Sequence, residues 1–303
     1  MHGNEWPLVF FTLLCQAAVG VFLFSEFLME GAVRRMGWTE VLPLSIFIRM
    51  GLLVITLTAV GISFFHLGNP QNAFLTLGNL RSSWLSREIL FLLIFLTCTA
   101  VLFAITLLSS PSSPFFRIFQ VVGGLAGLLL IFAMSRLYML PAVPTWNSML
   151  TPQLFFSSTF LLGTAFTAAL WALRLQAISP GLLPEIGESW IRRTSPLLAG
   201  LIVSFILISL LLTVIFLLRL QKFPPVFPAT SSIFSFPGIL LLIRIVFLLI
   251  AAGWTFFLFL RLRPAAAAIP HLSSWIIPLG LIIAAEVLGR FSFYAVFTRT
   301  GDL

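Results

Sequence analysis

Eight apolar runs, separated by short segments rich in Pro, Gly, Ser and charged residues, constrain the fold of this 303-residue chain more than any other feature. Each run has about 17–25 residues, which at a rise of about 1.5 Å per residue crosses a hydrocarbon core of about 30 Å. The runs are continuously apolar and do not alternate with period two, so they predict helices and not the strands of a barrel. We predict an all-α integral membrane protein, a bundle of eight transmembrane helices in one anchor domain over residues 1–303. The predicted spans are approximately residues 7–30, 42–66, 88–108, 115–137, 152–174, 197–218, 237–262 and 273–297.

The composition excludes a soluble domain and a nucleic-acid partner. Apolar residues make up 60% of the chain and charged residues 9%, whereas soluble domains have about 45–50% and about 25%. The net charge of +8 comes from basic residues that stand singly or in pairs between apolar runs, without the basic stripe that nucleic-acid binding requires. The lipid membrane is therefore the predicted surrounding of this chain.

The even number of spans places both termini on one membrane face, which we call side A; the opposite face is side B. Arg34 and Arg35 follow the first span and no basic residue precedes it. By the positive-inside rule this asymmetry predicts that side B faces the cytoplasm and that both termini are periplasmic. Glu30 follows the first run without a small-residue cleavage site, so we expect this run to be a retained helix and not a signal peptide.

The sequence offers no ligand set for a resident metal cofactor. Cys15 and Cys98 both lie inside apolar runs, with no CxxC pair and no CxxCH motif, whereas iron–sulfur clusters and structural zinc need four ligands. His66 and His271 fall on opposite membrane faces, so they cannot ligate one haem together. We predict no haem, no iron–sulfur cluster and no metal in this chain.

Charged residues inside the spans are expensive and need partners. Arg49 lies at the depth of Glu26, and we predict that the two form a structural clamp near side B. Arg244, Glu286 and Arg290 lie toward side A. Glu286 and Arg290 are spaced i,i+4, which places them on one helix face and predicts a pair. This leaves open a purely structural alternative, in which these two neutralise each other and Arg244 extends to the membrane surface.

His66 ends the second predicted span and Glu88 begins the third, and the loop 67–87 joins them on side A. A histidine and a carboxylate together at a membrane surface accept and relay protons near neutral pH. A local alternative exists for Glu88, in which Ser86 caps the helix and the acid in the first turn interacts with the helix dipole.

Four segments carry a resemblance to a known family. They are EWPLVFFT at 5–12, FHLGNP at 65–70 continuing to Ala73 and Phe74, SSWLSREI at 82–89, and GRFSFY at 289–294. Together they resemble the membrane anchor subunit of bacterial dimethyl sulfoxide reductase, over nearly the whole chain. HLGNP and SSWLSREI are the most specific of these segments.

The resemblance implies a haem-free, multi-pass subunit of the bacterial cytoplasmic (inner) membrane. It implies partners, a molybdopterin catalytic subunit and a four-cluster iron–sulfur subunit, which this chain anchors. It also implies that the chain binds exchangeable menaquinol and passes its electrons to the iron–sulfur subunit in anaerobic respiration, without performing the terminal reduction. In that family the histidine and glutamate at the positions of His66 and Glu88 are associated with quinol binding or oxidation, which implies catalytic roles for both.

Our hypothesis for the mechanism is that a quinol hydroxyl donates to neutral His66, and that Glu88 orients the imidazole or receives the proton next. An arginine would stabilise the developing quinolate oxygen. The remaining predicted quinol-binding residues are Trp84, Arg87, Arg244, Glu286 and Arg290.

Alternatives remain open from the sequence alone. Trp84 would stack on the quinone head or belong to the interfacial aromatic belt. Two other functions are possible for the chain as a whole. One is a secondary transporter, which commonly places its charges near the midplane on broken helices. The other is a mechanical anchor without a quinol site. The terminal electron acceptor does not follow from this sequence.

Overall fold

The computed structural model describes residues 6–65, 75–108, 114–176, 185–221, 235–262 and 271–297. Within these ranges the chain forms eight α-helices long and apolar enough to cross a membrane, one short 3₁₀ helix and no strand. The predicted all-α bundle of eight spans is confirmed. The elements are α1 (Trp6–Met36), α2 (Trp38–Ser63), η2 (Leu75–Asn79), α3 (Trp84–Leu108), α4 (Pro114–Leu137), α5 (Leu150–Gln176), α6 (Glu185–Leu220), α8 (Phe236–Leu262) and α9 (Ser273–Ala295).

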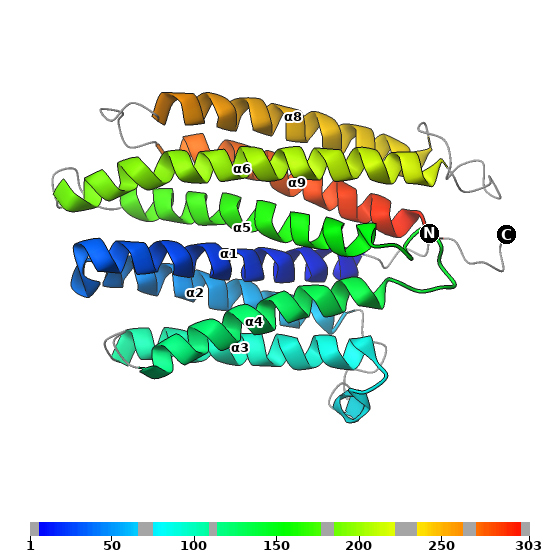
Figure 1. Cartoon of the computed structure of the whole chain (residues 1–303), viewed down its shortest axis with the longest axis horizontal. Helices are drawn as coiled ribbons and strands as arrows, with labels where there is room; N and C mark the ends of the chain where they lie inside the picture. The colour runs from blue at the N-terminus through cyan, green and yellow to red at the C-terminus, as the bar shows by residue number, and fades with distance from the viewer. Residues whose placement is uncertain are drawn as a thin grey trace.

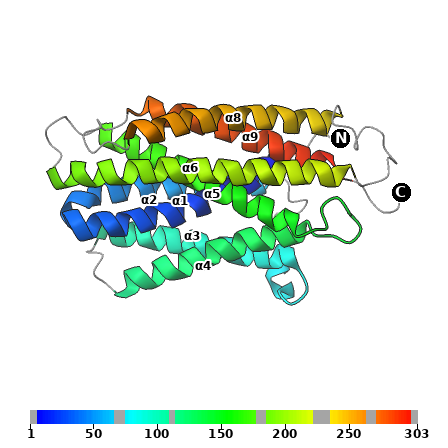
Figure 2. The same cartoon turned by 45° about the horizontal axis from the view of Figure 1, so that its top comes forward.

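The bundle has a buried centre and two outer helix pairs. Helices α1 and α5 pack against each other and are the most buried spans, while α3 with α4 and α8 with α9 form close pairs on opposite flanks (Figure 1). A second view shows α6 beside α8 along its length (Figure 2). The first turn of α1 and the last turn of α9 lie at the same end, which is side A (Figure 1). Which membrane face this end occupies stays a prediction.

Two glycines set the distance between the central helices. A β-carbon added to Gly20 of α1 would overlap the backbone of Thr159 and Gly163 of α5, and one added to Gly163 would overlap the backbone of Gly20. Small residues allow close backbone approach in membranes, where helix association depends on packing and not on the hydrophobic effect. This contact therefore positions α1 against α5.

We expect Gly163→Val to separate α1 from α5 and to destabilise the bundle by about 1–3 kcal/mol, the usual cost of overpacking a well-packed core. The measurement is the thermal denaturation midpoint of the purified protein. Gly280→Val is the matched control, because a β-carbon at Gly280 of α9 meets no atom within 4 Å. Equal midpoints for the two variants would contradict the proposed role of this contact.

The ends of the helices differ from prediction mainly in α6. The sixth span was predicted from residue 197, yet α6 begins at Glu185 and continues through Pro196. Proline removes one backbone donor and interrupts one intrahelical hydrogen bond. Pro196 is the twelfth residue of α6 and the helix continues to Leu220, so this proline does not end the helix.

Candidate functional site

A buried ion pair near side B joins four helices. Arg49 of α2 donates from Nε and Nη2 to the two carboxylate oxygens of Glu26 on α1, at 3.0 and 2.7 Å. Arg49 also donates to Ser45 and, at 2.8 Å, to Thr106 of α3, and Gln120 of α4 donates to Glu26 at 2.6 Å. The predicted Glu26–Arg49 pair is confirmed. Its charged atoms are satisfied by protein groups, as a structural clamp requires.

Glu286 of α9 is the centre of a second buried cluster, toward side A. Arg244 of α8 lies 3.0 Å from its Oε1, and Ser158 of α5 donates to its Oε2 at 2.5 Å. The same Arg244 nitrogen lies 2.9 Å from the hydroxyl of Ser209 on α6. The predicted pairing of Glu286 with Arg290 is wrong, since Arg244 is the ion-pair partner. The structural alternative in which Arg244 extends to the surface is wrong as well, because Arg244 is buried.

Gly289 explains why Glu286 pairs with Arg244 of the neighbouring helix and not with Arg290 of its own helix. The guanidinium of Arg244 lies against the α-carbon of Gly289, so a β-carbon there would overlap it. Without a side chain at position 289, Arg244 can cross α9 one turn from Glu286. An i,i+4 spacing makes two side chains neighbours on a helix, but a residue from the next helix can still be the closer partner.

Arg290 is held by neutral groups. Its Nη2 donates to Oε1 of Gln16 on α1 at 2.9 Å, and Gln16 donates in turn to the carbonyl of Phe155 at 3.2 Å. The guanidinium also lies over the Phe155 ring, 3.9 Å from its centroid, the geometry of a cation–π contact. The positive charge is therefore buried next to dipoles and an aromatic face.

The only two tyrosines of the chain meet beside this cluster. Tyr294 of α9 donates to Tyr138, which follows α4, with 3.0 Å between the two oxygens. Both are buried, and the rings of Trp146, Phe155 and Phe293 surround Tyr138. This pair was not predicted from the sequence. The sequence holds two tyrosines against 33 phenylalanines. The two tyrosines are 156 residues apart, so no local pattern indicates that they meet.

Glu88 lies deeper in its helix than predicted. The third span was predicted from residue 88, but α3 begins at Trp84, and the hydroxyl of Ser83 accepts from the backbone N–H of Ser86 at 3.2 Å. The cap is thus Ser83 and not Ser86, and no acid lies in the first turn. The local alternative for Glu88, an acid beside a capping Ser86, is therefore wrong.

Glu88 is buried, and its charge acts on both tyrosines. The side chain is 5% exposed, and its Oε2 has no hydrogen-bond partner among the residues that the structure describes. It lies within electrostatic range of Tyr138 and Tyr294. A buried carboxyl oxygen without a partner is costly, which makes this position the strongest candidate for contact with a further group.

Arg87 and Trp84 fix the segment before α3. Arg87 donates to the carbonyls of Leu80 and Arg81 at 2.9 and 2.7 Å. Its guanidinium lies 4.2 Å from the centroid of the Trp84 ring, and that of Arg136 lies 5.3 Å from it. These contacts orient the side A end of α3. Quinol-binding roles stay predictions for Trp84 and Arg87. They also stay predictions for Arg244, Glu286 and Arg290.

His66 lies outside the described residues. The second predicted span ended at this residue, whereas α2 ends at Ser63. Cys15 and Cys98 are buried thiols. In the part of the chain that the structure describes, no three His, Cys, Asp or Glu side chains come together as a metal site.

Comparison with known proteins gives one family over nearly the whole chain. Residues 1–296 match the family described as "DMSO reductase anchor subunit (DmsC)". The protein is 27% identical to the C chain of anaerobic dimethyl sulfoxide reductase from Escherichia coli K12 over 302 residues, 98% of this chain and 96% of that protein. It is 26% identical to YnfH, an anaerobic dimethyl sulfoxide reductase chain of the same organism, with the same coverage.

A third relative matches over a shorter stretch. The C chain of anaerobic dimethyl sulfoxide reductase from Haemophilus influenzae is 33% identical over 166 residues, which are 55% of this chain and 58% of that protein. No solved structure matches the chain.

Proposed function

This chain belongs to the DMSO reductase anchor subunit family, and from that premise we propose that it oxidises menaquinol at a site on side A built around Glu88 and His66. An anchor subunit of such a complex implies catalytic and electron-transfer partner subunits, and the eight apolar helices make this chain a multi-pass membrane protein. We further propose that the membrane is the bacterial inner membrane, and that the partners are a four-cluster iron–sulfur subunit and a molybdopterin subunit.

The observation that carries the proposal is the buried Glu88 oxygen without a partner in the described ranges. A quinol hydroxyl is a donor of the right chemistry for this acceptor, and its ring suits the aromatic surroundings of Tyr138. Because the carboxyl is buried, a donor that arrives from lipid would relieve a cost of about 1–3 kcal/mol.

The chemistry must release two electrons and two protons for each quinol oxidised to quinone. In the proposed step His66 accepts one hydroxyl proton and Glu88 the other, while both electrons pass to the iron–sulfur partner. Both residues then return their protons to side A. General base catalysis of this kind typically contributes about 10²–10⁴-fold to rate. The acceptor reduced by the catalytic partner is, by the family's name, dimethyl sulfoxide or a related compound.

The test is a fluorescence titration of a menaquinol-analogue inhibitor against membranes containing the assembled complex. We expect tight binding in the wild type and its loss in His66→Arg and in Glu88→Gln, with immunoblots showing both partner subunits still attached. Glu40→Gln, an exposed glutamate at the side B end, is the control and should bind as the wild type does. Absence of binding in the wild type would contradict the proposal and favour a mechanical anchor or a transporter.

A further inference from the structure

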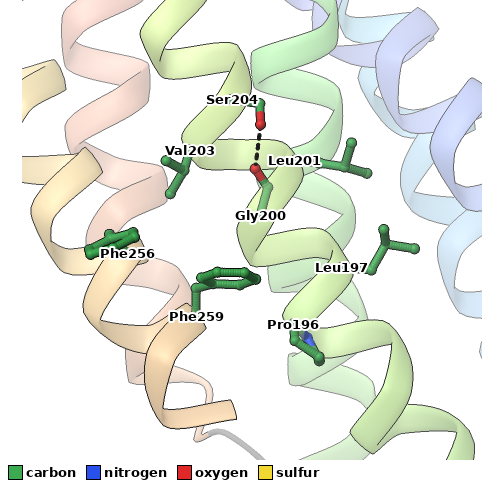
Figure 3. A pocket seen from close by; sticks show the side chains of 8 residues that line it. All are labelled: Pro196, Leu197, Gly200, Leu201, Val203, Ser204, Phe256 and Phe259. Atoms are coloured by element: carbon green, nitrogen blue, oxygen red, sulfur yellow. Dashed lines mark hydrogen bonds between the residues drawn. The ribbon is translucent and has the colours of Figure 1, made fainter. Parts of the chain in front are cut away.

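An apolar groove of about 340 Å³ lies between α6 and α8, on the opposite half of the bundle from Glu88. Figure 3 shows Phe256 and Phe259 of α8 on one wall and the stretch of α6 from Pro196 to Ser204 on the other. The Ser204 hydroxyl donates to the carbonyl of Gly200 at 2.9 Å, so its proton is already engaged within the helix. The lining therefore suits a hydrocarbon chain.

Gly200 makes the groove possible. A β-carbon at this position would lie 3.4 Å from the ring of Phe259, so any longer side chain would enter the space between the two helices. The stretch from Pro196 to Ser204 extends about 12 Å along the helix axis. Since Leu197 and Phe256 at its edges are exposed on the outer face of the bundle, the groove opens toward lipid and not toward the interior.

One exposed arginine, Arg193, stands on the groove face of α6 toward side B. Arg193 precedes Gly200 by seven residues, about two turns of α6, and so lies on the same helix face. Arg261 of α8 is also exposed, but it lies on the opposite side of α8 from Phe256 and Phe259, and its guanidinium packs on Phe257, 4.5 Å from the ring centroid. Arg193 lies about 10 Å closer to side B than Gly200, in the direction of the lipid head groups. Basic pockets between membrane helices are suited to anionic head groups.

We propose that the groove between α6 and α8 is a binding site for an anionic phospholipid. One acyl chain lies along Gly200 against Phe259, and the phosphate is held by Arg193. The charge at the mouth selects the head group, and the apolar lining holds the acyl chain. The site stands on different residues from the quinol proposal and does not depend on it.

The experiment uses the assembled complex in phosphatidylcholine nanodiscs that contain a small fraction of phosphatidylglycerol with a photoreactive acyl chain. Peptide mapping after irradiation should place the label on the segments around Gly200 and Phe259. We expect Gly200→Leu to lower this labelling to the level of other lipid-facing segments. Gly280→Leu, on open space of α9, should leave it unchanged.

The head-group arm uses Arg193→Gln, and Arg261→Gln on the opposite side of α8 is a control that should leave the labelling unchanged. An arginine near the membrane surface contributes about 1 kcal/mol of attraction to anionic lipid, so labelling by the anionic probe should fall about fivefold in Arg193→Gln. Arg35→Gln, an exposed arginine at the same end, should have no effect, and a photoreactive phosphatidylcholine should label less and not respond. Equal labelling by both lipids, or displacement of the label by a menaquinone analogue alone, would overturn the proposal.

Discussion

Glu88→Gln will strongly reduce quinol-driven turnover while the complex remains assembled. The amide keeps the size of the carboxyl, but its oxygen is a weaker hydrogen-bond acceptor than a carboxylate and does not accept a proton at neutral pH. Because a positioned general base contributes about 10²–10⁴-fold, we expect the rate with a reduced water-soluble naphthoquinol to fall about 100-fold or more. The measurement is steady-state oxidation of this donor by membranes, with dimethyl sulfoxide as acceptor.

Two further measurements separate chemistry from packing at Glu88. A low-potential one-electron dye that reduces the catalytic partners directly should support the same rate in Glu88→Gln as in the wild type. Glu88→Asp keeps a carboxyl on a side chain one methylene shorter, so it should recover part of the quinol-driven rate. Unchanged quinol oxidation in Glu88→Gln would remove this residue from the mechanism, and loss of the dye-driven rate would show a defect in assembly instead.

The sequence predicted the spans well because continuous apolarity over about 20 residues is the specific signature of a helix that crosses a bilayer. It also predicted the Glu26–Arg49 pair, since the two residues share a depth in adjacent antiparallel spans and each needs a partner there. Helix ends were less accurate. Ser83 and Ser86 are both plausible caps in the same short segment, and only the backbone geometry distinguishes them.

The pairing of Glu286 was not predictable from spacing alone. Local spacing favours Arg290, whereas the observed partner Arg244 depends on how α8 packs on α9 and on the missing side chain of Gly289. The Tyr138–Tyr294 contact has the same origin. Hydroxyls far apart in the chain give no periodic signal, and only the assembled bundle brings them to 3.0 Å.

The Arg244–Glu286 pair carries the second large prediction. Arg244→Met would leave the carboxylate of Glu286 buried with only Ser158 and Ser209 as hydrogen-bond donors. Removing one partner of a buried pair typically costs about 3–5 kcal/mol, because the other charge stays in a medium of low dielectric constant. We expect a clear fall in the thermal denaturation midpoint and in the amount of complex in the membrane. Arg35→Met, which changes an exposed arginine, should alter neither.

The double variant Arg244→Met with Glu286→Met separates two causes of that loss. Replacing both charges with apolar side chains removes the uncompensated carboxylate, and such replacements are often neutral or stabilising. The double variant should therefore recover most of the stability that Arg244→Met loses. If it is as unstable as the single variant, packing of Arg244 against Gly289 and Ser209 holds α8 to α9 and α6, and the ion pair itself contributes little. Recovery would show that the cost comes from the unpaired carboxylate of Glu286. The need to pair this carboxylate would then hold α5, α6, α8 and α9 together around Glu286.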